Sequence, residues 1–248
     1  MILRAVPAVT RAIAILRLLG RAKTPMGVKA ISQALSLVPS TSLHILRVLV
    51  AEEMVKVDAA KQYSLGMGML SLARTALQGS DFATLVQPRI DELSRHYAVT
   101  AIGVELPNLD HMIVVALSQT QAPVRLHVDI GSRFPALISA TGRCVAAFTG
   151  QPPAEIDKRF RALRWHNAPS HETWRKEVDA ARRQGFSIDR GNYIAGVTVV
   201  AVPVLNAAGT ISQTIASVGI SSQLDRATSV ALAHDMLEAA RAVAAELG

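Results

Sequence analysis

The positive charge of this chain is concentrated in its first 80 residues. Ten Lys and Arg residues stand there against three acidic residues, whereas residues 81–248 contain 16 of each sign. The whole formal net charge of +7 therefore belongs to the first third of the chain. A basic segment attracts polyanions, and a balanced segment of this length has no such preference. The charge pattern predicts two parts with different partners.

The composition is that of a globular protein. The chain has 248 residues, half of them hydrophobic, which is enough for a sizeable core and for two domains. Its only cysteine, Cys144, excludes an internal disulfide and a multi-cysteine zinc site, as expected in a reducing cytoplasm. We expect Cys144 to be a small core residue.

Neither a signal peptide nor a membrane segment is expected. Arg4, Arg11 and Arg17 interrupt the apolar N-terminus. The uncharged stretch 191–224 is long enough to span a membrane, but Pro203 and Gly209 interrupt it. Its β-branched runs flank the turn-like sequence NAAG, which favours two buried strands joined by a hairpin.

Apolar periodicity predicts three helices in residues 1–65. The first has Thr10 as its N-cap, and the second turns Ile31, Ala34 and Leu35 inward. The third begins at Pro39, a residue suited to the first turn of a helix. Its apolar face is separate from a narrow stripe that contains Ser40, His44, Arg47 and Ala51.

This third helix has the side chains that a reader of the DNA major groove needs. Hydroxyl groups at a helix N-terminus bind phosphate, and an arginine one or two turns later binds guanine. An ordinary solvated helix face is the alternative. The next residues, MVKVD, AAKQ and YSL, predict a hairpin with Lys56 and Lys61 on or near it. Three helices and a basic hairpin make a winged helix-turn-helix.

The remaining residues predict a linker helix and an α+β body, which gives domains at 1–65, 66–80 and 81–248. Leucines on the linker helix would pack against the same helix of a second subunit or against the body. In the body, an antiparallel sheet flanked by helices would include a hairpin around PNLD, a strand at 124–130 and the pair at 197–218. A helix over 135–148 would present free N–H groups near Ser139–Gly142, and such groups favour binding of a carboxylate. The alternative is that Ser139 and Thr141 only initiate the helix.

These segments resemble the IclR family of bacterial transcription regulators. TRAIAILRLL, LSLVPSTSLHILRVL and QYSLGMGMLSLA are similar to its opening helix, its recognition helix and its wing with linker. The resemblance implies an oligomer, a dimer or tetramer, that binds operator DNA. Two departures, His44 in place of a common Arg and Val38-Pro39 in place of Pro-Lys, leave the DNA sequence preference open. The expected DNA contacts are Ser40, Thr41, Ser42, His44, Arg47 and Lys61.

The same resemblance extends over the body and implies a GAF-like effector domain that binds small organic acids and uses no cofactor. The positions that it implies for the effector are Ala140, Thr141, Gly142, Asp189, Val199, Ala216 and Val218. Because the last three are apolar where relatives can have Cys or Ser, we expect an aromatic or longer-chain acid. Whether the effector represses or activates stays open.

Catalysis is the competing hypothesis. The sequence has no GxSxG, P-loop, HExxH or GxGxxG motif, and its scattered histidines do not predict a metal site. His127, Asp129 and Cys144 could be imagined as the site of a small-molecule hydrolase with an accessory basic domain. Hydrogen bonding at a strand edge explains the first two more simply, so we expect no enzyme.

Overall fold

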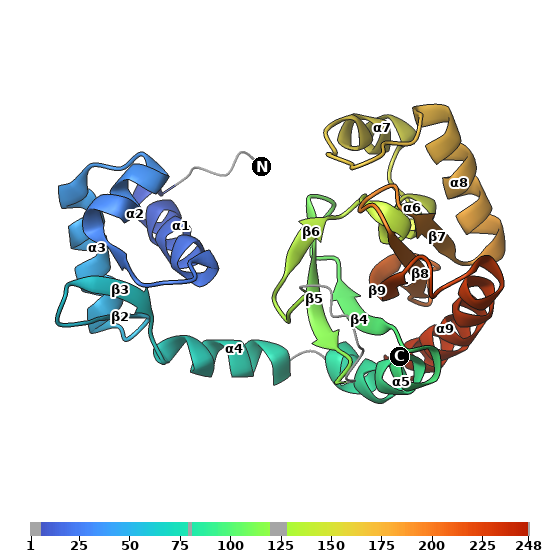
Figure 1. The fold of residues 1–248 in the computed structure, drawn as a ribbon, viewed down its shortest axis with the longest axis horizontal. Coiled ribbons are helices and arrows are strands. Elements are labelled where there is room, and N and C mark those ends of the chain that lie inside the picture. The colour runs from blue at the N-terminus through green and yellow to red at the C-terminus, as the bar shows by residue number, and fades with distance from the viewer. Residues whose placement is uncertain (1–5, 79–80, 120–127, 248) are drawn as a thin grey trace. The chain divides into compact units, whose positions relative to one another are not determined.

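The computed structural model describes residues 6–78, 81–119 and 128–247. The chain forms two compact units, residues 1–79 and 80–248, and each is described by itself (Figure 1).

The first unit contains three helices, a hairpin and a fourth helix. Its elements are α1 (Pro7–Arg21), β1 (Met26–Gly27), α2 (Val28–Leu35), α3 (Pro39–Ala51), β2 (Val55–Val57), β3 (Gln62–Leu65) and α4 (Gly68–Gln78). The strands form a small antiparallel sheet in the order β1-β3-β2. The predicted winged helix-turn-helix is confirmed, and β1 is an addition that the sequence analysis missed.

One apolar cluster joins the three helices to the hairpin. Ile15, Ile31 and Leu46 are fully buried in it, and Tyr63 of β3 covers its side. Two details were predicted wrongly. Helix α1 begins at Pro7, so Thr10 lies inside it and its hydroxyl donates to Val6 O. Ala34 is exposed, because Ile31 and the small Ser32 occupy the buried side of α2.

Two glycines allow α4 to start against the end of α3. Gly66 N–H donates to Met54 O and Gly68 N–H donates to Glu53 O. A Cβ atom on Gly66 would lie 2.1 Å from Glu53 O, and one on Gly68 would lie 2.9 Å from it. The GMG sequence at 66–68 is therefore explained by close backbone packing.

The second unit is built on a six-stranded antiparallel sheet in the order β6-β5-β4-β9-β8-β7. Its strands are β4 (Thr100–Glu105), β5 (His111–Leu117), β6 (Arg133–Pro135), β7 (Ser187–Arg190), β8 (Val197–Leu205) and β9 (Ile211–Ile220). The predicted hairpin in the uncharged stretch is confirmed by the pairing of β8 with β9. The α+β class is confirmed as well.

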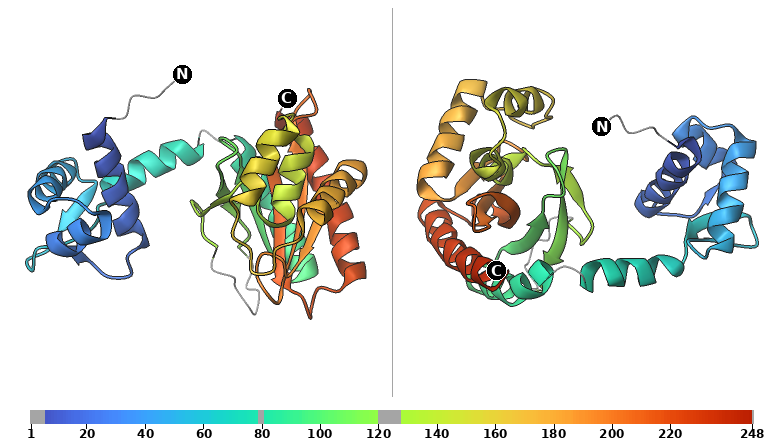
Figure 2. Two further views of the ribbon diagram at one scale, coloured as in Figure 1. Left: turned by 90° about the horizontal axis from the view of Figure 1, so that it is seen from above. Right: turned by 180° about the vertical axis from the view of Figure 1, so that it is seen from behind.

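Helices cover both faces of this sheet (Figures 1 and 2). Helices α5 (Asp81–Tyr97) and α9 (Arg226–Leu247) lie side by side on one face, and α6 (Ser139–Phe148) packs on the other. Helix α8 (His171–Gln184) packs on α6, and α7 (Pro153–Arg161) joins the same apolar cluster. Strand β8 is buried on both faces, which explains its run of apolar residues, interrupted only by Thr198.

The body differs from prediction at its short elements. Strands β6 and β7 were not predicted, and α6 begins at Ser139 rather than near Pro135. Of the strand expected over 124–130, residues 124–127 lie outside the described residues, and 128–130 form no strand. Among the described helices no single one is long and apolar enough to cross a membrane, and only α2 and α3, bent by 113°, reach that length and hydropathy together.

Candidate DNA interface and effector site

Helix α3 presents a polar stripe to solvent. Its apolar side packs into the core through Leu46 and Leu49, so the opposite side is free. Ser40, His44 and Arg47 are exposed on that side, and Thr41 beside them is half-buried. The helix contains no acidic residue. This surface can therefore approach a polyanion without like-charge repulsion from its own helix.

Ser42 does not belong to this surface. Its side chain is fully buried, and its Oγ accepts a hydrogen bond of 2.9 Å from Ser32 Oγ of α2. The prediction that the Ser42 side chain contacts DNA is therefore wrong. The residue is small and polar because it joins two helices where they pack closely.

The first turn of α3 has backbone N–H groups without an acceptor inside the helix. Pro39 occupies the first turn, and the N–H of Ser42 makes the first helical hydrogen bond, to Val38 O at 3.1 Å. The N–H groups of Ser40 and Thr41 precede that bond and have no acceptor inside the helix. Together with the positive end of the helix dipole, they favour an anion here.

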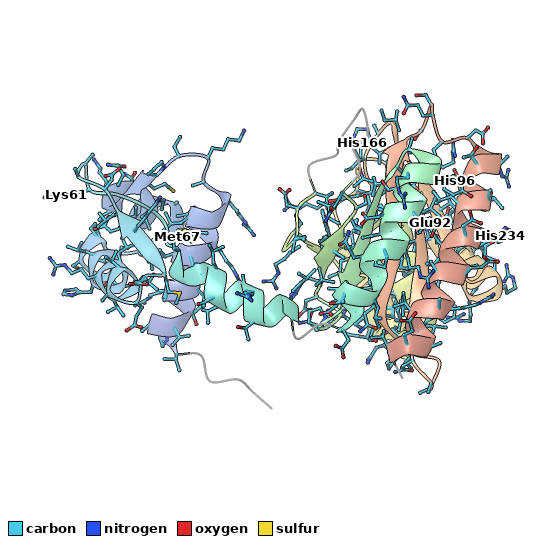
Figure 3. The ribbon with its side chains drawn as sticks, turned by 90° about the horizontal axis from the view of Figure 1, so that it is seen from below. Lys61, Met67, Glu92, His96, His166 and His234 are labelled. Carbon is cyan, nitrogen blue, oxygen red and sulfur yellow. The ribbon has the colours of Figure 1, made fainter. Side chains whose placement is uncertain are left out.

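The tip of the β2–β3 hairpin presents Lys61 to solvent (Figure 3). Its N–H donates to Asp58 O at 3.0 Å, and Gln62 N–H donates to Asp58 Oδ1 at 2.8 Å. Lys61 has a φ of 57°, the left-handed conformation that closes such a tight turn. The charge is thus placed at the outermost point of the wing.

The predicted effector positions meet between α6 and the sheet. Val199 of β8 pairs with Val218 of β9, and Ala201 pairs with Ala216, so these side chains share one face. Ala140 of α6 and Val199 belong to the same buried apolar cluster, against which Val218 packs. A cavity of about 720 Å³ shares Leu163 and Tyr193 with the residues packed against this cluster, but none of the seven predicted effector positions lines it.

The first turn of α6 is tightly constrained. Ser139 has a φ of 59°, and the first helical bond is made by Gly142 N–H to Ile138 O at 2.8 Å. A Cβ atom on Gly142 would lie 1.9 Å from the carbonyl carbon of Leu137, so no larger residue fits. Ala140 and Thr141 are buried at this turn. Their N–H groups precede the first helical bond and face no acceptor within the helix.

The sequence analysis missed the arginine that holds this site together. Arg143 of α6 is fully buried; its Nε donates to Glu177 at 2.7 Å and its Nη2 donates to Asn192 Oδ1 at 3.0 Å. Its Nη1 lies 3.5 Å from Oδ2 of the buried Asp189. An arginine within the otherwise apolar sequence PALISATGRCVAAF was the available signal.

Asp189 is held between β7 and α6. It lies on strand β7, where it pairs with Val199 and shares its face of the sheet. Its Oδ1 accepts a hydrogen bond of 2.8 Å from Asn192 N–H, and its Oδ2 faces Arg143. Asp189 therefore joins β7 to α6, beside the apolar cluster.

Cys144 does not support a hydrolytic site. Its thiol is buried and donates to Ala201 O at 3.3 Å. Burial raises the pKa of this thiol to about 12, although the nearby Arg143 charge lowers it in part. A nucleophilic cysteine requires the opposite shift. Within the described ranges no three His, Cys, Asp or Glu residues are grouped to hold a metal ion, and His127 lies outside those ranges.

Comparison with known proteins agrees with both units. Residues 8–59 match the IclR helix-turn-helix domain, and residues 74–245 match the C-terminal domain of the bacterial transcriptional regulator IclR. The uncharacterized HTH-type transcriptional regulator RhmR of Escherichia coli is 29% identical over 98% of this chain and 94% of its own length.

Solved structures have the same fold. An IclR transcriptional regulator from Alicyclobacillus acidocaldarius superposes with a TM-score of 0.86 at 25% identity, over 98% of this chain and all of its own. An IclR homolog from Microbacterium hydrocarbonoxydans, solved in complex with 4-hydroxybenzoate, superposes with a TM-score of 0.77 at 19% identity. The match covers 97% of this chain and 98% of the homolog. The matching domains are those of regulators and not of enzymes. This chain belongs to the IclR family of bacterial transcriptional regulators.

Proposed function

We propose that the protein binds operator DNA through α3 and the wing, and that a small organic acid bound beneath α6 changes this binding. The observation on which the proposal depends is the exposed stripe of Ser40, His44 and Arg47 on a helix without acidic residues. Lys61 at the tip of the wing provides a second basic contact.

Each DNA contact has a distinct role. Arg47 is the residue suited to a two-pronged hydrogen bond with guanine in the major groove, and His44 lies one turn before it on the same stripe. Ser40 and Thr41, with their free N–H groups, bind a phosphate at the helix start. Lys61 binds phosphate on the flank, which sets orientation without reading sequence.

The effector is an acid with an apolar body. Its carboxylate binds the N–H groups of Ala140 and Thr141 at the first turn of α6, which Gly142 allows to pack closely on Leu137, and its body lies on Val199, Ala216 and Val218. Asp189 and Arg143 fix the position of α6 above the sheet. The apolar sheet face supports an aromatic or longer-chain acid, as does the 4-hydroxybenzoate of the structural neighbour.

The working protein is a homo-oligomer with at least two DNA-binding heads. Leu70 and Leu72 of α4 are exposed, as is Met67 just before the helix, which gives apolar surface for the same helix of a second subunit. The effector acts by favouring one arrangement of the two heads, which requires that it bind the arrangements with different affinity.

A gel shift tests the DNA contacts. Fragments selected from genomic DNA by the wild-type protein are titrated at two salt concentrations. Arg47→Ala should weaken specific binding by about tenfold or more, because a bidentate arginine–guanine contact is lost. Arg183→Ala, an exposed arginine of α8, is the matched control and should bind as the wild type does. A salt-insensitive shift, or full affinity in Arg47→Ala, contradicts the proposal.

A thermal-shift screen tests the effector class. Benzoate, 4-hydroxybenzoate and octanoate should raise the melting temperature, because a ligand that binds only the folded state stabilises it. Glyoxylate and acetate at the same concentration should raise the melting temperature less. Stabilisation by the small polar acids alone is the result that rejects an apolar effector.

A further inference from the structure

A cavity of about 720 Å³ in the second unit lies outside the proposed effector positions, none of which lines it. Its walls are formed by the β4–β5 turn, the end of β6 with the residues after it, helix α7, and the loops that follow α7 and β7. Pockets for small molecules typically have volumes of about 300–1,000 Å³. The cavity is therefore large enough for a ligand of its own.

The buried part of the cavity lining is apolar. Ala136 and Leu137, which lie between β6 and α6, are both buried. Leu163 of the loop after α7 is half-buried, and it packs against two apolar clusters of the second unit. Leu109 of the β4–β5 turn lines the cavity and packs against one of these clusters. Such walls suit the apolar body of an organic ligand and give little to a bare inorganic ion.

The outer part of the lining has an excess of positive charge. Lys158, Arg159 and Arg164 line the cavity together with two acidic residues, Asp110 and Glu155. Arg159 engages both carboxylates, because its Nε donates to Glu155 at 2.8 Å and its Nη1 pairs with Asp110. Lys158 and Arg164 are exposed, and neither has an ion-pair partner among the described residues. Two cations are thus available to an anionic group at the mouth of the cavity.

Tyr193 adds an uncharged donor to the same wall. Its side chain is half-buried, and burial raises the pKa of Tyr193, so its hydroxyl stays protonated at neutral pH. Backbone bonds fix the loop that carries it: His166 N–H donates to Tyr193 O at 3.3 Å, and Asn167 N–H donates to Asn192 O at 2.8 Å. The ring offers apolar surface, and the hydroxyl can donate to an anion.

We propose that this cavity binds a second organic acid, whose anionic group meets Lys158 and Arg164 and whose apolar body lies on Leu137 and Leu163. The orientation of the acid follows from burial, because the two cations are exposed and Leu137 is buried. An inorganic anion would leave the apolar walls uncovered, and an uncharged compound would leave both cations without a partner. The site is separate from the acid site proposed at α6 and does not depend on it.

Photolabelling of the full chain locates the site. The probe is 4-benzoylbenzoate, an acid with a two-ring apolar body whose ketone bonds to neighbouring C–H groups on irradiation. The irradiated protein is digested with chymotrypsin, and labelled residues are identified by mass spectrometry. We expect label in the walls of the cavity, at 109–110, 158–164 or 193. Label confined to the effector positions of α6, β8 and β9 would overturn the second site and leave the acid site at α6 standing.

Removal of the two unpaired cations tests their role. In a variant with Lys158→Gln and Arg164→Gln, the probe concentration that half-saturates labelling of the cavity should rise about fivefold, since two exposed ion pairs are lost. The matched control, Arg161→Gln with Arg183→Gln, removes the same charge from exposed positions of α7 and α8 that do not line the cavity. The control should be labelled as the wild type is. All four positions are exposed, so both variants should fold.

The possible failures are distinguishable. Absence of label from the cavity overturns the second site, and so does equal half-saturation of the wild type and of the variant without Lys158 and Arg164. Equal labelling of the cavity by benzophenone, which has no carboxylate, overturns the binding of an acid there. The effector proposal is judged separately, by the thermal-shift screen and by label at the effector positions. Either proposal can therefore fail while the other stands.

Discussion

At the scale of single residues, one buried charge links several elements of the second unit. Arg143 is fully buried and contacts three side chains. They are Glu177 of α8, Asp189 of β7, and Asn192 in the loop after β7. Removing a charge from water is costly, and only several well-placed partners compensate for that cost. One side chain therefore ties α6 to both the neighbouring helix and the edge of the sheet.

Replacement of Arg143 should destabilise this unit. Arg143→Met leaves Asp189 as an uncompensated buried charge, so the free energy of unfolding should fall by about 3–5 kcal/mol. Urea unfolding followed by tryptophan fluorescence measures it, because both tryptophans, Trp165 and Trp174, lie in this unit. Adding Asp189→Asn should restore part of the loss, and the exposed Arg183→Met should change little. Equal stability of Arg143→Met and the wild type would show that the network contributes nothing.

Cys144 should make stability fall at alkaline pH. Its pKa is about 12 in the folded chain because of burial, compared with 9.0 ordinarily. Between these values the unfolded chain loses the thiol proton first, so the free energy of unfolding decreases as pH rises through this window. Urea unfolding of wild type and Cys144→Ala at pH 8 and pH 10.5 isolates the effect: the wild type should lose more stability. The native thiol should also resist iodoacetamide at pH 8.5, and rapid labelling of the native protein would refute its burial.

At the scale of elements, long periodic segments were predicted well and short ones were not. Helices α1 and α3 and the β8–β9 hairpin follow clear apolar patterns, and all are confirmed. Strands β1, β6 and β7 have only two to four residues, too few to show alternation. They form because a neighbouring strand offers free backbone groups, which is a tertiary property.

The wing should contribute affinity without specificity. Lys61→Ala should weaken binding to all DNA sequences alike and reduce the slope of log affinity against log salt by about 1, because one phosphate contact is lost. Filter binding at four salt concentrations, with specific and random fragments, measures both effects. Lys176→Ala, on α8 in an ion pair with Glu172, is the control and should leave the slope unchanged. A sequence-dependent loss in Lys61→Ala would mean that the wing reads bases.

At the scale of the whole molecule, the division of charge corresponds to a division of tasks. Three basic residues of the first unit, Arg47, Lys56 and Lys61, are exposed on α3 and the wing. The second unit is balanced overall, and its buried arginine is neutralised internally by Glu177 and Asp189. The basic and the balanced parts of the chain are thus suited to different ligands.

Disrupting α4 should separate the subunits. Leu70→Glu places a charge on the apolar surface that we assign to the subunit contact, so light scattering should show a monomer at micromolar concentration. Operator affinity should fall because a monomer has one DNA-binding unit and can contact only one half-site. Ser71→Glu, an exposed position about 100° around the helix from both Leu70 and Leu72, is the control and should keep the oligomer. An unchanged mass in Leu70→Glu would place the subunit contact elsewhere.

The two-part organisation, the winged helix-turn-helix and the α+β body could be predicted from residue order alone, because charge distribution and apolar periodicity are local properties of the chain. The contact of Ser42 with α2 and the pairing of Arg143 with Asp189, 46 positions apart, could be seen only in the folded chain. Side-chain partners across elements depend on how those elements pack. No pattern within one helix or strand records which buried polar atoms will meet.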